Sequence, residues 1–284
     1  MTLEDRRRFY AEEIEMLANV RTPALVEALA TVPREAFLSP GPWVIRSEAD
    51  FGAPARATPD ADPRHVYHNV AVGIDPTRQL FNGAPSLLAM TIDNLMVRPG
   101  DRVLHLGTGL GYYTALLAHC TGPSGRVLGV EVDAGLATKA RENLGTRSWV
   151  EIRHGDGLAP IAEPFDAILI NAGVTHPLDA WLDALAPAGR LILPLTAGSP
   201  QMGPITKGGM LRIVEDRGQF SVRMIGFVAI YGAIGLRDDS MNALLGQALM
   251  RSPMIPATRL RRDPHEREAA CWLHGATWCF STQS

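Results

Sequence analysis

Cysteine and net charge are both scarce in this 284-residue chain. The three cysteines, Cys120, Cys271 and Cys279, are an odd number and form no CxxC pair, which argues against a disulfide framework and favours a reducing compartment. Lys and Arg together number 27 against 30 Asp and Glu, a formal net charge of -3. A chain with this balance is not expected to bind nucleic acid or an anionic membrane through counterion release.

Long apolar runs are also missing. The longest apolar stretch, residues 224–236, is interrupted by glycines and is too short to cross a bilayer. The first residues contain no apolar segment typical of a signal peptide, and the chain shows neither an internal repeat nor a low-complexity run. With 46% apolar residues, the chain has enough to bury a core. The expectation is a cytoplasmic globular protein.

The first forty residues predict two helices. Thr2 is placed to cap the first, and Thr22-Pro23 opens a second helix that must end before Pro33. Residues 41–63 are rich in Pro, Ala, Asp and Gly without a sustained period, which predicts a long irregular connection. Whether residues 41–64 form a lid stays open.

From Pro85 onward the pattern alternates between helices and strands. Strands are expected at 102–106, 126–132, 149–153, 165–171 and 190–195, and helices at 85–96, 112–119, 134–144 and 178–185. Strands that are apolar on both faces and alternate with helices predict a parallel sheet covered on both sides. Residues 210–215 and 219–230 predict a β-hairpin, and a final strand is expected within 270–280. The predicted fold is a doubly wound, Rossmann-like α/β domain.

Three strand ends carry the residues expected to bind a ligand. The first strand runs into Gly107-Thr108-Gly109-Leu110-Gly111, the second ends in Glu131, and the third ends in Gly155-Asp156-Gly157. Glycines at such a junction let the backbone approach a ligand closely, and a carboxylate at the second strand accepts hydrogen bonds from ribose hydroxyls. Because open α/β sheets bind nucleotides at the carboxyl ends of their strands, the three elements together predict a nucleotide-type site.

Two ligands fit this pattern, a dinucleotide and S-adenosylmethionine. The spacing GxGxG differs from the GxGxxG that surrounds a pyrophosphate, and Asp156 is better suited to a ligand that lacks phosphate. The methyl donor is therefore favoured over a nicotinamide cofactor. A nicotinamide-dependent oxidoreductase and a non-catalytic subunit that binds the donor are the less favoured alternatives.

The chain resembles the protein-L-isoaspartate O-methyltransferase family over roughly residues 22–196. The matching segments, in order, are Val32-Pro33-Arg34-Glu35-Ala36-Phe37, Tyr67, residues 79–85, residues 103–112, Gly155-Asp156-Gly157, Phe165-Asp166 and residues 189–194. The resemblance implies a class I methyltransferase that transfers a methyl group from S-adenosylmethionine to a carboxylate of a peptide or protein. A small metabolite or one specific peptide, methylated on oxygen or nitrogen, is the alternative acceptor.

The resemblance also implies which residues contact the donor. The predicted donor-binding residues are His105, Gly107, Thr108, Gly109, Gly111, Tyr112, Glu131, Val132, Asp156, Gly157 and Asn171. Residues 1–84 are expected to form part of the acceptor site, residues 85–235 the donor-binding domain, and residues 236–284 a C-terminal extension packed on the same domain. The oligomeric state is not predicted.

The sequence departs from the family at the acceptor side. The family's Ser-x-Pro element reads Gly83-Ala84-Pro85 here, so the serine hydroxyl is missing and Asn82 is the residue expected to position the acceptor. Asn69 and Asn171 are weaker candidates for that role. A carboxylate acceptor needs no general base, whereas a hydroxyl or amine would need one, and the histidines nearest in sequence are His65, His68 and His176.

Two histidine features complete the predictions. His105 replaces the acidic residue that usually precedes the glycine loop, and its protonation is expected to weaken donor binding below about pH 6.5. The alternative is a histidine packed under the loop and hydrogen-bonded to the backbone. Cys271, His274 and Cys279 lack paired ligand spacing and are expected along one strand, so no metal site is predicted.

Overall fold

The computed structural model describes residues 1–47, 54–158 and 163–283, and these fall into two compact units. The first unit comprises residues 1–100 and 108–154, and the second comprises residues 101–107 and 155–284. The chain therefore passes from the second unit to the first inside the glycine loop, between Gly107 and Thr108. The predicted boundaries after residues 84 and 235 are a different division and stay a prediction.

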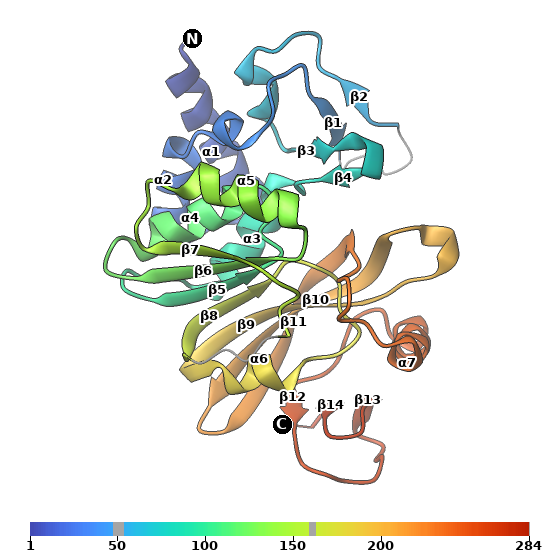
Figure 1. Ribbon diagram of the computed structural model, residues 1–284. Helices are drawn as coiled ribbons and strands as arrows, with labels where there is room; N and C mark the ends of the chain where they lie inside the picture. Colours follow the sequence, from blue (N-terminus) through green and yellow to red (C-terminus); the bar gives the residue numbers. More distant parts are fainter. Residues whose placement is uncertain (48–53, 159–162, 284) are drawn as a thin grey trace. The chain divides into compact units, whose positions relative to one another are not determined.

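The first unit contains N-terminal helices, a small antiparallel sheet and two parallel strands with their helices (Figure 1). Its helices are α1 (Leu3–Ala18), α2 (Pro23–Thr31), α3 (Pro85–Leu95), α4 (Tyr112–Thr121) and α5 (Ala134–Leu144), with short 3-10 turns at Arg34–Phe37, Pro63–Val66 and Pro76–Arg78. Its strands are β1 (Val44–Ser47), β2 (Arg56–Ala57), β3 (Val70–Asp75), β4 (Leu80–Phe81), β6 (Arg126–Glu131) and β7 (Val150–His154). The small sheet has the order β2-β1-β3-β4, while β6 and β7 pair in parallel.

Local sequence explains where the helices of the first unit begin. Thr2 and Asp5 form a reciprocal capping box at α1, and Pro23 occupies the first turn of α2, where its missing N–H costs nothing. Asp133 caps α5 by accepting hydrogen bonds from the backbone N–H groups of Gly135 and Leu136. These starts confirm the predicted helices.

The second unit is a mixed sheet with the strand order β13-β14-β12-β11-β10-β9-β8-β5 (Figure 1). Its strands are β5 (Arg102–Leu106), β8 (Phe165–Ile170), β9 (Leu185–Ala197), β10 (Ile205–Asp216), β11 (Gln219–Tyr231), β12 (Arg259–Arg261), β13 (Cys271–His274) and β14 (Cys279–Ser281). Its helices are α6 (Asp179–Asp183) and α7 (Asp239–Arg251), with a 3-10 turn at Pro200–Met202. Strands β5, β8 and β9 are parallel, and the remaining neighbours are antiparallel.

The hairpin β10–β11 forms where it was predicted. Asp216 pairs with Gln219, so Arg217 and Gly218 alone make the turn, and both have positive φ. Two consecutive positive φ angles give a turn whose twist matches that of the strands. The core of this unit lies around β9, whose Leu191 and Leu193 are fully buried.

Three sequence predictions of local structure are wrong. Residues 41–63 are not wholly irregular, because β1 pairs with β2 and β3; residues 48–53 of this segment lie outside the described residues. The helix expected at 178–185 is only the short α6, since Leu185 already pairs with Phe165 in the sheet. The single strand expected within 270–280 is two antiparallel strands, β13 and β14.

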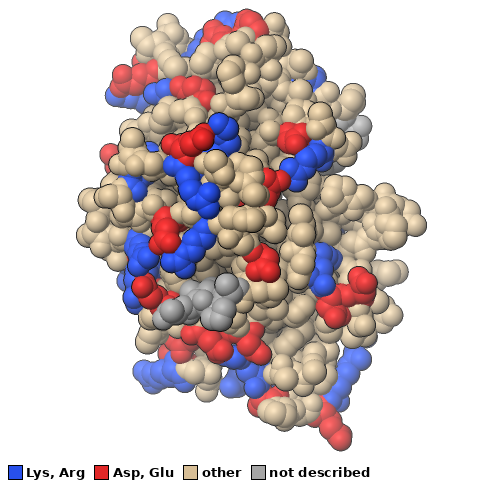
Figure 2. Space-filling view, in the orientation of Figure 1, with Lys and Arg blue, Asp and Glu red and all other residues tan. Residues whose placement is uncertain are grey.

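None of the helices in the described ranges has the length and apolar content needed to span a membrane. Lys and Arg side chains lie beside Asp and Glu side chains over the described residues of the face shown in Figure 2. This mixture agrees with the formal net charge of -3.

Candidate functional site

The glycine loop of the first unit closes onto the carboxylate of Glu131. The backbone N–H of Gly109 donates to Oε2 of Glu131 at 2.7 Å, and the N–H of Asp133 donates to Oε1 at 3.1 Å. Glu131 ends β6 and is only 6% exposed. Burial raises the pKa of this carboxyl, and the two backbone N–H donors partly offset the effect. Each carboxylate oxygen keeps a further lone pair for a ligand hydroxyl.

Two loop glycines of the first unit adopt backbone conformations that other residues rarely adopt. Gly109 and Gly111 have φ angles of 55° and 93°. A Cβ at Gly111 would lie 2.8 Å from Cδ1 of Leu144 in α5, so the loop fits against that helix only without a side chain. Gly111 is also the N-cap of α4 and directs the first turn of that helix.

Thr108 and Tyr112 flank these glycines and are both buried. Among the described residues, Oγ1 of Thr108 has no hydrogen-bond partner. The ring of Tyr112 packs edge-on against the ring of Phe37, with 5.7 Å between the ring centroids, so this side chain contacts the N-terminal region. Val132 follows Glu131 and is exposed, and its carbonyl lies 3.1 Å from Nε2 of His154. Thr108 thus offers a buried hydroxyl beside the glycine loop, whereas the ring of Tyr112 packs against Phe37.

The second unit contains the other predicted donor residues, at the ends of β5 and β8. The backbone N–H of Asn171 donates to Leu106 O at 2.8 Å, and its Nδ2 donates to Gly107 O at 3.2 Å. Gly107 has a φ of 84°, and a Cβ there would lie 3.1 Å from Asn171 O. Because β5 and β8 are parallel neighbours, their carboxyl ends bring Gly107 and Asn171 together.

Asp156 and Gly157 form a second turn in the same unit. Oδ1 of Asp156 accepts a hydrogen bond from Leu158 N–H at 3.0 Å, which leaves the exposed Oδ2 available to a ligand. Gly157 has a φ of 78°, and its carbonyl accepts the indole N–H of buried Trp181 at 3.1 Å. The turn is therefore anchored on one side by a buried aromatic and presents a carboxylate on the other.

His105 on β5 is fully buried, and burial lowers the pKa of its imidazole to about 3. The sequence hypothesis that His105 protonates near pH 6.5 and repels the donor is therefore wrong. A neutral imidazole is the stable form throughout the range in which an enzyme of this kind is assayed.

We expect His105 to affect stability, rather than donor binding, in mild acid. Its folded pKa lies below its unfolded value of about 6.5, so the unfolded chain binds more protons and the free energy of unfolding falls as pH falls from 6.5 toward 3. At pH 5 this loss is about 2 kcal/mol. Urea unfolding at pH 7.5 and pH 5 checks it, with donor affinity expected to stay flat down to pH 5.5. The variant His105→Gln should lack this loss and His154→Gln should keep it; equal losses in all three proteins would contradict the prediction.

On the acceptor side, Asn82 is held by its carbonyl oxygen. Oδ1 accepts hydrogen bonds from Val72 N–H at 2.9 Å and from Nη2 of Arg34 at 3.3 Å. Because Oδ1 is occupied, the amide can only offer the two N–H donors of Nδ2 to a ligand. Asn69 instead accepts a hydrogen bond from Ser86 N–H at the start of α3.

Sequence reasoning missed the residue that orients Asn82. Arg34 is fully buried and donates to the carbonyls of Val66 at 2.7 Å and Val70 at 2.8 Å, in addition to Asn82. Nearby, Tyr67 accepts from Arg34 N–H and donates to a carboxylate oxygen of Glu35. The available signal was an arginine directly after the apolar pair Val32-Pro33, because a charge that follows an apolar segment into the core must be hydrogen-bonded there.

Two of the three candidate histidine bases have partners for a ring nitrogen. Nε2 of His65 lies 2.8 Å from a carboxylate oxygen of Asp60, and Nδ1 of His176 lies 2.8 Å from the hydroxyl of Thr175. His68 contributes its carbonyl to Arg34 at 3.3 Å.

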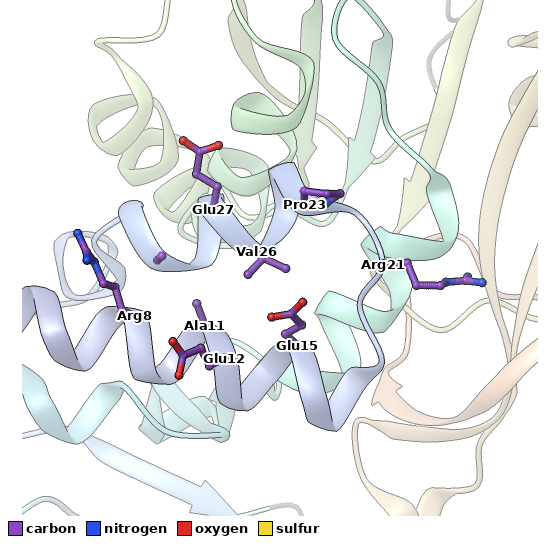
Figure 3. Close-up of a pocket in the computed structure, with 9 residues that line it drawn as sticks. Arg8, Ala11, Glu12, Glu15, Arg21, Pro23, Val26 and Glu27 are labelled. Carbon is purple, nitrogen blue, oxygen red and sulfur yellow. The ribbon is translucent and has the colours of Figure 1, made fainter.

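A surface cleft of about 400 Å³ lies between α1 and α2, and no predicted donor residue is among those that line it. Figure 3 shows Val26 directed toward α1, with Glu12 and Glu15 on that helix, whereas Glu27 and Arg21 point away from the opening. The cleft has a small apolar floor and an acidic rim. It contains none of the features expected of a nucleotide-type site.

The chain is similar to known methyltransferases over most of its length. The sequence profile described as Protein-L-isoaspartate(D-aspartate) O-methyltransferase (PCMT) matches residues 57–225. A protein-L-isoaspartate O-methyltransferase of Methanothrix thermoacetophila is 31% identical over 230 residues, which cover 80% of this chain and 96% of that protein. The Methylorubrum extorquens protein of the same name is 32% identical over 234 residues, covering 80% of this chain and 89% of that protein.

Solved structures show the same fold. One protein-L-isoaspartate O-methyltransferase superposes with a TM-score of 0.61 at 22% identity, covering 85% of this chain and 68% of its own. A beta-aspartate methyltransferase (PCMT) structure from Plasmodium falciparum, in complex with S-adenosyl-L-homocysteine, gives a TM-score of 0.60 at 17% identity and covers 80% and 97% of the two chains. These likenesses confirm the predicted α/β class I methyltransferase fold. The chain belongs to the protein-L-isoaspartate O-methyltransferase family.

Proposed function

We propose that this methyltransferase transfers a methyl group from S-adenosylmethionine to the side-chain carboxylate of an isoaspartyl residue in a peptide or protein. Membership of the family and the arrangement at Glu131 support the proposal. The relatives' names specify the isoaspartyl acceptor, and the loop of this chain is built around a buried carboxylate suited to a ribose.

The residues of the first unit fit the donor. Glu131 has one lone pair left on each oxygen, and Thr108 has a buried hydroxyl with no hydrogen-bond partner among the described residues. Buried polar atoms are normally satisfied, so an orphaned hydroxyl beside the glycine loop supports a ligand there. We assign the ribose hydroxyls to Glu131 and a polar atom of the donor to Thr108, with Gly109 and Gly111 giving the backbone its close approach.

The second unit, considered by itself, also carries groups that suit the donor. Asp156 has one carboxylate oxygen available to accept a hydrogen bond from an exocyclic amine, as in adenine. Nδ2 of Asn171 donates a hydrogen bond to the carbonyl of Gly107, which fixes the backbone at the end of β5. His105, neutral and buried, is assigned to packing beneath this strand end.

The reaction requires positioning more than acid–base chemistry. S-adenosylmethionine supplies a methyl group that its sulfonium charge has already activated. A carboxylate acceptor is ionised at neutral pH, so no side chain must remove a proton from it. The role left to this chain is to orient the acceptor and exclude water, and orientation alone contributes up to about 7–11 kcal/mol in favourable cases.

Asn82 is the residue we assign to the acceptor. Its Oδ1 is fixed by Val72 and Arg34, so Nδ2 is left to donate hydrogen bonds to an acceptor carboxylate. We expect Asn82→Asp to raise the KM for the acceptor roughly 10- to 100-fold, because donors are replaced by a repelling charge. Steady-state kinetics and donor binding check this, with the donor dissociation constant expected to stay unchanged. Asn94→Asp on α3 serves as the control, and an unchanged acceptor KM in Asn82→Asp would remove Asn82 from the site.

A specific peptide is a second candidate acceptor, and Gly83 favours it. This glycine stands where the family has its serine, at a φ of 76°, and a Cβ there would lie 2.9 Å from Cδ2 of Leu88. A serine at this position would be strained, so the loop itself differs from that of the repair enzymes. The loop at Gly83 differs from the family pattern, whereas the glycine loop matches it. This combination favours an enzyme that binds the same donor but methylates fewer substrates.

The deciding assay is transfer of a labelled methyl group to an isoaspartyl peptide, with the matching aspartyl peptide as control. A base-labile ester formed on the isoaspartyl peptide alone is the expected result. Donor binding is measured in parallel. A chain that binds S-adenosylmethionine but labels neither peptide would contradict the isoaspartyl proposal and favour a specific peptide or a metabolite.

A further inference from the structure

Four side chains that commonly bind metals meet at the C-terminal end of the second unit. They are His265, Cys271, His274 and Cys279, and one ligand atom from each lies within 4.8 Å of the others. Strand β13 carries Cys271 and His274, and Cys279 on β14 pairs directly with His274. The chain reverses at residues 275–278, where Gly275 N–H donates to Trp278 O at 2.9 Å. The expectation that these cysteines and His274 share one strand is therefore wrong.

The contact between Cys271 and His265 has the spacing of two metal ligands. Sγ of Cys271 lies 3.5 Å from Nε2 of His265. Zinc bonds of about 2.3 Å to sulfur and about 2.0–2.1 Å to nitrogen, at a tetrahedral angle, place those atoms roughly 3.5 Å apart. Both thiol side chains are buried, with Cys271 6% exposed and Cys279 fully enclosed.

The other ring nitrogen of His265, Nδ1, makes the kind of hydrogen bond that metal-binding histidines make. Nδ1 lies 2.8 Å from the carbonyl oxygen of Asp263 and therefore donates its proton there. This fixes the tautomer that leaves Nε2 unprotonated and facing Cys271. A histidine that binds a metal almost always donates its other ring N–H to a carbonyl or carboxylate.

His274 supplies an independent sign of a missing partner. Its Nδ1 is buried and has no hydrogen-bond partner among the described residues. Its ring lies 4.8 Å from that of His265, at an interplanar angle of 79°. Buried ring nitrogens without a partner are rare, and an ion at the centre of the cluster would satisfy this one.

The surrounding charges and backbone suit thiolate ligands. The backbone N–H of Glu268 donates to Sγ of Cys271 at 3.4 Å. Arg261 on β12 forms ion pairs with Asp263 and Glu268, which hold the segment that leads from β12 to β13. Two thiolates and two neutral imidazoles balance the charge of a divalent ion.

We propose that His265, Cys271, His274 and Cys279 bind one Zn²⁺ ion as a closed, four-coordinate structural site. Two sulfur and two nitrogen ligands in a tetrahedral set are typical of zinc, and four protein ligands leave no open position for catalysis. The ion ties the segment before β13 to the β13–β14 pair. Since β14 pairs with β12 and β12 with β11, the ion stabilises the edge of the sheet in the second unit.

The test is the metal content of the purified full chain, measured by elemental mass spectrometry. We expect about one Zn²⁺ per chain, removed by a strong chelator with a fall in Tm and restored by Zn²⁺ alone. The chain with Co²⁺ in place of Zn²⁺ should show the visible bands of a tetrahedral thiolate complex. Cys279→Ser and His265→Gln should each lose the ion, and His265→Gln removes a less enclosed side chain in case the cysteine variant fails to fold.

Matched controls separate this site from general metal binding. Cys120→Ser alters the buried cysteine of α4 in the first unit, and His119→Gln alters a partly exposed histidine beside it. Both should keep the full zinc content. Equal zinc in His265→Gln and the wild type would overturn the proposal. So would a chain that takes up no Zn²⁺ and in which only one of the three thiols reacts after denaturation, because Cys271 and Cys279 would then form a disulfide.

Discussion

Replacing Glu131 by glutamine is expected to weaken binding of S-adenosylmethionine roughly 30- to 150-fold, which corresponds to about 2–3 kcal/mol. The carboxylate accepts N–H groups from Gly109 and Asp133 on its two oxygens. An amide keeps only one of these acceptors and directs N–H groups at the other donor. The variant therefore loses charged hydrogen bonds to the ribose and also loosens the glycine loop.

Isothermal titration with S-adenosylmethionine, and with its demethylated product, measures the effect directly. Glu142→Gln is the matched control, because Glu142 is an exposed carboxylate on α5 whose partner is Lys139. The control should bind the donor as the wild type does. Donor affinity in Glu131→Gln within about threefold of the wild type would contradict the assignment of this carboxylate to the ribose.

The backbone features around the glycine loop could be predicted from sequence because their signals are local, whereas the assignment of donor-binding residues stays a prediction. Glycines at positive φ and the start of a helix follow one another within a few residues, as at Gly107 to Tyr112. Such positions depend on backbone geometry that only certain residues adopt. The strands from β5 to β8 lie within a residue or so of their predicted bounds for the same reason.

Features that depend on distant partners could not be predicted in this way. Strand β1 is recognisable only through its pairing with β3, since four residues give no measurable alternation. Residues 271 and 279 come together because the chain reverses between them, and His265 joins them from a segment without regular structure. The burial of His105 likewise depends on how the strands pack, and it removes the predicted pH dependence of donor binding.

The acceptor side depends most on such long-range contacts, and Arg34 is the main example. Its guanidinium is fully buried and donates to three backbone carbonyls, those of Val66, His68 and Val70, and to Oδ1 of Asn82. The face of Tyr112 lies 5.9 Å from its Cζ. A single side chain thus donates hydrogen bonds to the backbone carbonyls of the segment that leads into β3. It also orients Asn82, the residue assigned to the acceptor.

Replacing Arg34 by methionine is expected to lower the free energy of unfolding by about 3–5 kcal/mol. Methionine fills much of the volume but removes the arginine donor from three backbone carbonyls and leaves Oδ1 of Asn82 with Val72 N–H alone, so the loss is due to hydrogen bonding rather than to a cavity. Arg8→Met, which removes an exposed ion pair with Glu4, should cost less than about 1 kcal/mol. Urea unfolding monitored by circular dichroism compares the three proteins.

Kinetics distinguishes a purely structural role for Arg34 from a positioning role. At a temperature where Arg34→Met stays folded, we expect the KM for an isoaspartyl peptide to rise while the dissociation constant for S-adenosylmethionine stays near the wild-type value. The reason is that Nη2 of Arg34 holds Oδ1 of Asn82, whereas the carboxylate of Glu131 is bound by the glycine loop. If the variant loses stability while the acceptor KM stays unchanged, the role of Arg34 is purely structural. A variant as stable as the wild type would show that the buried carbonyls find other partners, and that the fold does not depend on the arginine of the Val-Pro-Arg segment.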